Sequence, residues 1–181
     1  QLMTAPTTTA RRALNKPQED CQSNPELRTT CFVYGPANSN TRAAVVSFPY
    51  TAGTTSQSAN TGVEVPTTHT IMRPTLDVGS VWGVAYQRES RQAFVSAFMK
   101  RHVAYGPNGT GAIYKIDTTN NTASFFTSIP AGPNLHNTGD YFNDNGDTGW
   151  NAVGKTSLGD IDIGENGTSL WAINLFDRRL Y

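Results

Sequence analysis

The chain lacks an excess of charge of either sign and lacks long apolar runs. It carries 14 Lys and Arg against 14 Asp and Glu in 181 residues, so its formal net charge at pH 7 is zero. A neutral chain has no long-range attraction for nucleic acid or for an anionic lipid surface. No apolar run approaches the roughly 20 residues that a membrane-spanning helix needs. We therefore expect no nucleic-acid partner and no direct membrane insertion.

Long helical periodicity and the common catalytic motifs are also missing. The sequence contains no G-x-S-x-G elbow, no H-E-x-x-H pair and no P-loop. The three histidines (His69, His102 and His136) are scattered and do not have the spacing of zinc ligands. His102 and His136 remain candidate general bases, but neither has a recognisable nucleophile nearby in sequence. These absences favour a non-catalytic protein over an enzyme.

The composition that is present is typical of a secreted all-β protein. Only 15% of the residues are charged, 37% are hydrophobic, and Thr, Asn, Gly and Ser are abundant. The two cysteines, Cys21 and Cys31, lie close together, which predicts a disulfide closing a small loop. Two reduced, buried thiols are the alternative.

Residues 79–129 contain four short apolar runs separated by polar turn residues. The β-branched and aromatic content of the runs predicts strands, and the short connectors predict antiparallel hairpins. The runs are Val81–Tyr86, Ala93–Met99, Ala112–Ile116 and Ala123–Ile129. Four strands in about 50 residues is the size of one β-propeller blade.

The pattern begins again at Leu158. Residues 158–163 and 169–175 repeat the first hairpin, and one constant offset aligns Gly83 with Gly159 and Phe94 with Leu170. The basic pair Lys100-Arg101 has a looser counterpart in Arg178-Arg179, and Leu180-Tyr181 resembles the start of a third strand. The fold class we expect is all-β, with β-propeller-like antiparallel four-stranded blades that form a partial propeller, a fragment of a larger domain.

This repetition predicts the domain organisation. Residues 1–20 form an extended N-terminal arm, and residues 21–181 form the partial propeller. The propeller region divides into a hairpin (residues 30–50, strands 30–34 and 43–50), a full blade (about 79–129), a loop (130–157) and the start of the next blade (158–181). A further short strand is expected near residues 69–72.

The long loop holds the densest group of oxygen ligands. Asx residues surround Gly146, and hard oxygen ligands around a glycine turn suggest calcium. The candidate metal ligands are Asp140, Asn143, Asp144, Asn145 and Asp147. The EF-hand register is not matched, and Asx residues also shape turns without metal. Calcium is therefore a possible cofactor, and no other cofactor is indicated.

Two further groups suggest surface chemistry. Asp160 and Asp162 alternate with isoleucines, so both carboxylates should share one strand face, where they could bind a cation or satisfy backbone amides. Trp82, Trp150 and Trp171 could form a sugar-stacking surface, although strand context favours core packing for Trp82 and Trp171.

The order of several motifs resembles the amino-terminal propeller-like region of large bacterial surface proteins, which often continue into adhesin-type SdrD B-like repeats. The similarity covers roughly residues 20–181. The motifs are Glu26–Gly35, Ser47–Tyr50, Val81–Arg88, Ala97–His102, Gly109–Tyr114, Gly159–Ile163 and Asn174–Tyr181. The resemblance carries no catalytic residue.

What the resemblance implies is a non-catalytic structural or adhesion module at a bacterial cell surface or outside the cell. Its expected partners are the remainder of the same polypeptide or neighbouring copies that complete the propeller, and a surface glycan or protein ligand. The alternative is a metal-dependent propeller hydrolase, lactonase- or phytase-like, that uses the acidic loop at residues 140–147.

Overall fold

The computed structural model describes residues 24–52, 69–137, 141 and 148–181. The chain divides into a smaller unit (residues 1–27 and 48–69) and a larger unit (residues 28–47 and 70–181). In the smaller unit, Tyr50–Ala52 forms one turn of 3₁₀ helix, η1. No helix in the described ranges is long and apolar enough to cross a membrane. The larger unit carries the fold.

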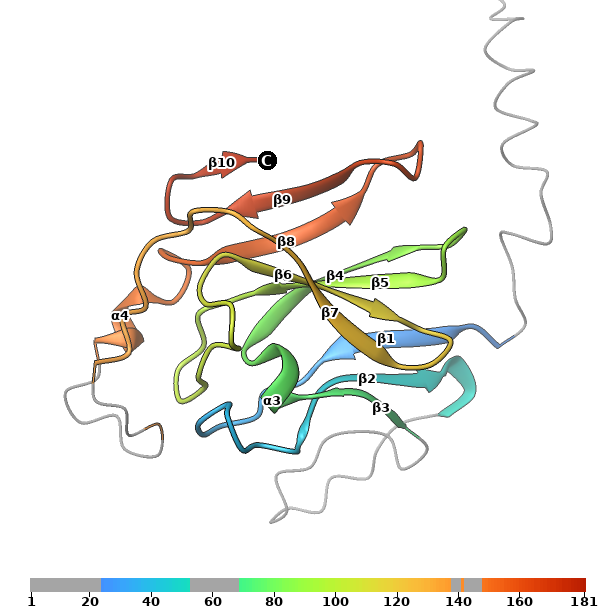
Figure 1. Cartoon of the computed structure of the whole chain (residues 1–181), viewed down its shortest axis with the longest axis horizontal. Coiled ribbons are helices and arrows are strands. Elements are labelled where there is room, and N and C mark those ends of the chain that lie inside the picture. The colour runs from blue at the N-terminus through green and yellow to red at the C-terminus, as the bar shows by residue number, and fades with distance from the viewer. Residues whose placement is uncertain (1–23, 53–68, 138–140, 142–147) are drawn as a thin grey trace, which may run out of the picture. The chain divides into compact units, whose positions relative to one another are not determined.

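The described strands form three β-sheets, in which neighbouring strands pair antiparallel (Figure 1). The first sheet has the order β1 (Glu26–Thr30), β2 (Ala43–Pro49), β3 (Thr70–Pro74). The second has the order β4 (Val81–Gln87), β5 (Gln92–Ala97), β6 (Ala112–Asp117), β7 (Thr122–Ser128). The third has the order β10 (Arg179–Leu180), β9 (Leu170–Asn174), β8 (Leu158–Ile163). Two short helices, α3 (Thr75–Val78) and α4 (Gly149–Ala152), lie between strands. The all-β class is confirmed.

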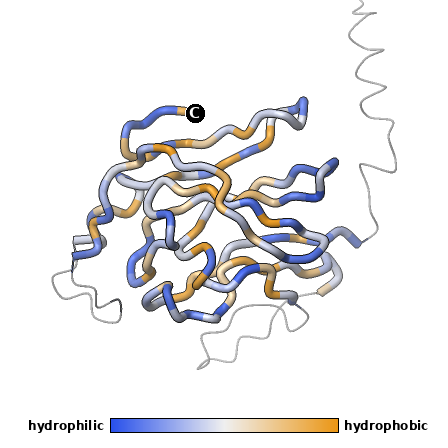
Figure 2. The backbone as a smooth tube through the Cα atoms, in the orientation of Figure 1, coloured by the Kyte–Doolittle hydropathy of each residue, from blue (hydrophilic) through white to orange (hydrophobic). Residues whose placement is uncertain are grey.

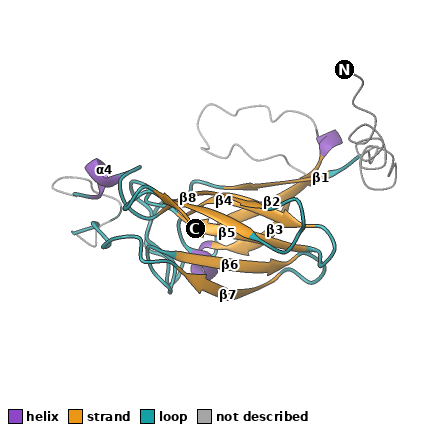
Figure 3. Ribbon diagram, turned by 90° about the horizontal axis from the view of Figure 1, so that it is seen from above, coloured by secondary structure: helices purple, strands orange, loops and turns teal. Residues whose placement is uncertain are grey.

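The strands form because their apolar residues follow the period of a pleated sheet. In β4, Val81, Gly83 and Ala85 are buried while Trp82 and Tyr86 are exposed. The inner strand β5 is buried along nearly its whole length, as expected for a strand whose two faces are both covered. Figure 2 shows apolar residues along the strands and hydrophilic residues at the hairpin tips, and Figure 3 shows the loops gathered at the strand ends.

One turn type joins three of the strand pairs. Each connector ends in a residue with left-handed backbone, at Arg91 (φ 53°), Asn121 (φ 55°) and Arg178 (φ 61°). Side chains that precede these residues hold the turns: Asp117 Oδ1 accepts the Thr119 N–H at 2.8 Å. In the same way Asn174 Oδ1 accepts the Phe176 N–H at 3.0 Å. The same kind of turn thus closes the β4–β5, β6–β7 and β9–β10 connections.

The three sheets stack face to face through two separate cores. The first core joins the first and second sheets and contains Val45, Met72, Val95 and Tyr114. The second core joins the second and third sheets and contains Phe94, Ile113, Leu158, Ile161 and Ala172. Val95 and Phe94 are neighbours on β5 and enter opposite cores, so the second sheet is covered on both faces.

The repeated hairpin is present, but the predicted alignment was wrong by one residue. Val84 pairs with Val95, and Ile161 pairs with Ala172, so counterparts lie 77 positions apart in both strands. Gly83 and Gly159 lie 76 positions apart and are therefore not counterparts. A shift of one residue moves a side chain to the other sheet face, so Phe94 corresponds to Trp171 rather than Leu170. The expected start of a third strand is confirmed, since Tyr181 and Ala172 exchange two backbone hydrogen bonds of 2.9 Å.

Two other local predictions were wrong. A strand was expected at residues 30–34, but β1 covers Glu26–Thr30. The Cys31 N–H still bonds to Ala44 O of β2 at 2.8 Å, and beyond it the chain leaves this sheet, so that the Gly35 N–H bonds to His102 O at 2.8 Å. Core packing was favoured for Trp82 and Trp171, but these side chains are 56% and 48% exposed. Both tryptophans alternate with buried neighbours and so lie on the opposite side of their strands from them.

Candidate functional site

The paired carboxylates on β8 occupy the face that was predicted for them. Asp160 and Asp162 are exposed, while Ile161 is buried and Ile163 is half-buried in the second core. Asp160 Oδ1 accepts the Ile161 N–H at 3.0 Å, and Asp162 Oδ1 accepts the Ile163 N–H at 2.8 Å. Each carboxylate thus satisfies a backbone amide on a strand at the edge of its sheet, which is the structural role considered for this pair.

The five candidate calcium ligands, Asp140, Asn143, Asp144, Asn145 and Asp147, lie outside the described residues. Calcium binding and the hydrolase alternative that depends on this loop therefore stay predictions. The two described ends of the loop are joined: Thr148 Oγ1 donates to Leu135 O at 2.6 Å, and Thr148 N–H donates to Asn137 Oδ1 at 2.9 Å. In the part of the chain that the structure describes, no group of three His, Cys, Asp or Glu is placed to hold a metal ion.

The two candidate histidine bases pack beside this loop against tyrosines. The His136 ring centroid lies 5.0 Å from the Tyr141 ring and 6.2 Å from the Tyr105 ring. His102 Nδ1 lies 3.0 Å from the Tyr141 carbonyl oxygen. Burial raises the pKa of Tyr105, whose hydroxyl donates to Met99 Sδ at 3.1 Å. These contacts pack His102, His136 and Tyr105 together where the loop leaves the sheets, which is a structural role.

A buried lysine forms a group that the sequence did not reveal. Lys100 is 6% exposed, and its Nζ donates to Cys31 O at 3.1 Å and lies 5.9 Å from the centre of the Trp82 ring. Burial lowers the pKa of Lys100 to about 8. Burial also raises the pKa of the Cys31 thiol. The only sequence signal is the position of Lys100 directly after a strongly apolar run.

Cys31 is half-buried, and its expected disulfide partner Cys21 lies outside the described residues. The disulfide therefore stays a prediction.

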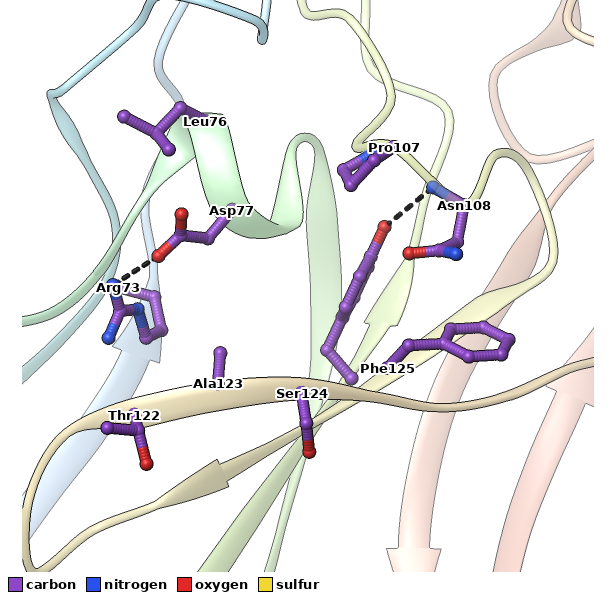
Figure 4. A pocket seen from close by; sticks show the side chains of 10 residues that line it. Arg73, Leu76, Asp77, Pro107, Asn108, Thr122, Ala123, Ser124 and Phe125 are labelled. Carbon is purple, nitrogen blue, oxygen red and sulfur yellow. Dashed lines mark hydrogen bonds and ion pairs between the residues drawn. The ribbon is translucent and has the colours of Figure 1, made fainter.

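An open cavity of about 410 Å³ lies between β3, α3 and β7 (Figure 4). Arg73 and Asp77 form an ion pair at one side, and Arg73 also donates to the Asn121 carbonyl. On the other side, the Tyr114 hydroxyl accepts the Asn108 N–H at 3.2 Å. Because Arg73 is engaged by these two partners, its charge holds β3, α3 and the β6–β7 turn together.

An exposed apolar surface lies on the outer face of the third sheet, and we define it as Trp171, Ile173 and Leu180. Their side chains are 48%, 45% and 62% exposed. Leu180 on β10 pairs directly with Ile173 on β9, and Trp171 lies two residues from Ile173 on the same side of that strand. Such a patch on a sheet face is a candidate binding surface.

The fold and these sites define a class of protein: an all-β module made of stacked, repeated antiparallel sheets. No family model matches the chain, and no solved structure matches it. The chain is similar to Colossin-D of Dictyostelium discoideum, with 41% identity over 114 residues, which cover 58% of this chain and 12% of that protein. It is also similar to Colossin-A (32% over 119 residues) and Colossin-B (27% over 162 residues) of the same organism. These matches cover 62% and 89% of this chain but 1% and 4% of the two relatives.

These relatives correct the resemblance to bacterial surface proteins. They are proteins of a eukaryote, and no bacterial adhesin family matches the chain. The assignment to bacteria and to SdrD B-like adhesins was therefore wrong. The motifs that suggested it, such as Val81–Arg88 and Asn174–Tyr181, are strand and turn segments, and alternating apolar strands with tight turns occur in many unrelated all-β proteins.

Proposed function

We propose that this chain is a non-catalytic structural or adhesion module of a larger extracellular protein, built from propeller-like blades stacked face to face. The observation that carries the proposal is the recurrence of one pairing register. The pair Val84 and Val95 in the second sheet recurs as Ile161 and Ala172 in the third. A sheet that repeats itself and packs on its copy is the building principle of propellers and related repeat proteins.

The contact between the first strands of the two sheets supports the propeller-like arrangement. The second sheet is a simple four-stranded meander in the order β4-β5-β6-β7, as in a propeller blade. A Cβ on Gly83 of β4 would lie 2.8 Å from the backbone nitrogen of Ile161 on β8, so these two strands approach closely at a glycine. In a propeller the first strand of each blade lies innermost, where neighbouring blades converge.

The extracellular location rests on the low charge and the Thr- and Asn-rich composition. The chain spans 12% or less of each of the three colossins, so these relatives support no role for a whole protein, and its structural or adhesive role is proposed here. Its partners would be the remainder of the same polypeptide or neighbouring copies, with a surface glycan or protein as ligand.

Hydrogen exchange tests the repeat module. If the sheets form one stacked unit, the slowest amides of β4–β7 and of β8–β9 open together with the same free energy. Opening of β8–β9 alone, at a much lower free energy than β4–β7, would contradict the proposal. Adhesion is tested separately by counting cells retained on beads that carry the native chain and on beads that carry the heat-denatured chain.

A further inference from the structure

The outer face of the third sheet is the counterpart of a face that is buried elsewhere in the same chain. At the offset of 77 positions, Trp171 corresponds to Phe94 and Ile173 to Ser96. Leu180 corresponds to Ile113, because Leu180 pairs with Ile173 as Ile113 pairs with Ser96.

The exposure of the two faces differs sharply. Phe94, Ser96 and Ile113 are 5%, 0% and 2% exposed, because the third sheet covers them. Trp171, Ile173 and Leu180 are 48%, 45% and 62% exposed. The terminal repeat of a stacked array normally has a polar outer face. An apolar outer face is therefore that of an internal repeat.

We propose that a further antiparallel sheet of the same repeat docks on the outer face of the third sheet. This inference rests on the proposed repeat module and names the partner of that face. Each sheet turns small or aliphatic residues toward the sheet before it, with Ala93 and Val95 of β5 in the first core and Ala172 of β9 in the second. The docking sheet therefore presents Ala, Val, Leu or Ile at the corresponding positions.

The residues on β8 define where this sheet lies. The counterpart of Gly83 is Asp160, and the counterpart of Ala85 is Asp162. Gly83 lets the β8 backbone approach β4, whereas the carboxylates on β8 prevent an equally close approach. The docking sheet thus covers β9 and β10 and leaves Asp160 and Asp162 at a polar rim, as in protein interfaces with an apolar centre.

A second copy of this chain fits the face less well. The faces that the second and third sheets turn toward their predecessors are already covered in this chain. A second copy would have to offer the outer face of its first sheet, whose strands do not share the pairing register of the second and third sheets. We therefore assign the docking sheet to further sequence of the same polypeptide.

Hydroxyl-radical footprinting with mass spectrometry tests the inference. The natural protein, purified at its full length from cells that make it, is compared with the isolated 181-residue chain. Oxidation of Trp171 should be severalfold slower in the natural protein, while oxidation of Trp82, 56% exposed on β4, should be unchanged. Equal oxidation of Trp171 in the two samples would overturn the inference, and so would concentration-dependent protection of Trp171 in the isolated chain, which would indicate a second copy.

Matched variants connect the protection to the face. In the natural protein, Ile173→Ser should restore fast oxidation of Trp171, whereas Ile71→Ser, at a similarly exposed isoleucine on β3 (49%), should not. Equal effects of the two variants would count against docking on this face. Because the repeat module is tested by joint amide exchange of β4–β7 and β8–β9, an exposed Trp171 together with joint exchange would refute only the docking sheet.

Discussion

The hydroxyl of Ser96 donates a 2.8 Å hydrogen bond to the carbonyl oxygen of Gly159, and this bond joins the second sheet to the third. Ser96 is fully buried. A buried carbonyl that loses its donor keeps the cost of its desolvation. Ser157 has a similar role, since its hydroxyl reaches Ala97 O at 2.9 Å. Buried serines therefore connect the stacked sheets.

Ser96→Ala should lower the free energy of unfolding by about 1–2 kcal/mol, because the Gly159 carbonyl is left without this donor. Urea denaturation followed by tryptophan fluorescence measures the change. The control is Ser124→Ala on the exposed face of β7, which should change stability by less than about 0.5 kcal/mol. Equal losses in the two variants would show that the bond between the sheets contributes nothing.

Much of the strand pattern could be predicted because its signals are local. The four runs between Val81 and Ile129 alternate or cluster apolar residues and are bounded by turn residues, and they became β4 to β7. β1 (Glu26–Thr30) could not be found this way, because Glu-Leu-Arg-Thr-Thr has little strand character and is held by pairing with β2. Tertiary context overrides propensity in such segments.

The sites were harder to predict because burial depends on which sheet covers a face. Trp82 and Trp171 resemble core residues in sequence, yet the structure leaves both exposed. Lys100 was noted only as half of a basic pair, yet it is buried and its Nζ donates to Cys31 O. The alignment of Gly83 with Gly159 was wrong because it matched two identical residues 76 positions apart. The true offset of 77 follows from which residues pair between the strands, and the sequence alone does not contain that pairing.

Gly83→Ala and Gly159→Ala should have very different effects, although both glycines are buried. A Cβ at Gly83 would meet the Ile161 nitrogen at 2.8 Å and the Asp160 Cα at 3.0 Å, and backbone cannot move aside easily. The nearest atom to a Cβ at Gly159 is Leu175 Cδ2 at 3.3 Å, the end of a flexible side chain. We expect Gly83→Ala to cost about 1–3 kcal/mol and Gly159→Ala less than about 1 kcal/mol. Thermal unfolding of both variants is the measurement, and the reverse order would refute the close contact between β4 and β8.

Asn121 should tolerate glycine but not valine. Its φ of 55° lies in the left-handed region, which is open to Gly, accessible to Asn and costly for β-branched residues. Asn121→Val should therefore destabilise the chain by about 1–2 kcal/mol, and Asn121→Gly should be close to neutral. Thr119→Val in the same exposed turn is the control and should have little effect. Chemical denaturation of the three variants checks the ranking, and a valine tolerated equally at both positions would contradict the turn geometry.

Burial of Lys100 should make stability depend on pH between about 8 and 10.5. Burial lowers the pKa of Lys100 from the ordinary 10.5 to about 8, so in this window the unfolded chain binds a proton that the folded chain does not. Because stability rises with pH wherever the unfolded state binds more protons, the cost of burying the ammonium is full below pH 8 and disappears as the pH approaches 10.5. The difference in pKa corresponds to about 3 kcal/mol.

The measurement compares the wild type with Lys100→Met by urea denaturation at pH 7 to 10.5. Because the charge of Lys100 lowers the pKa of Cys31, both proteins carry Cys31→Ser, so that the difference between them isolates Lys100. We expect the wild type to gain about 3 kcal/mol relative to Lys100→Met as the pH rises, with the gain confined to pH above about 8. Lys115→Met on β6 serves as the control for removal of a half-buried lysine. A pH-independent difference between wild type and Lys100→Met would mean that Lys100 is hydrated in solution and does not lie buried over Trp82.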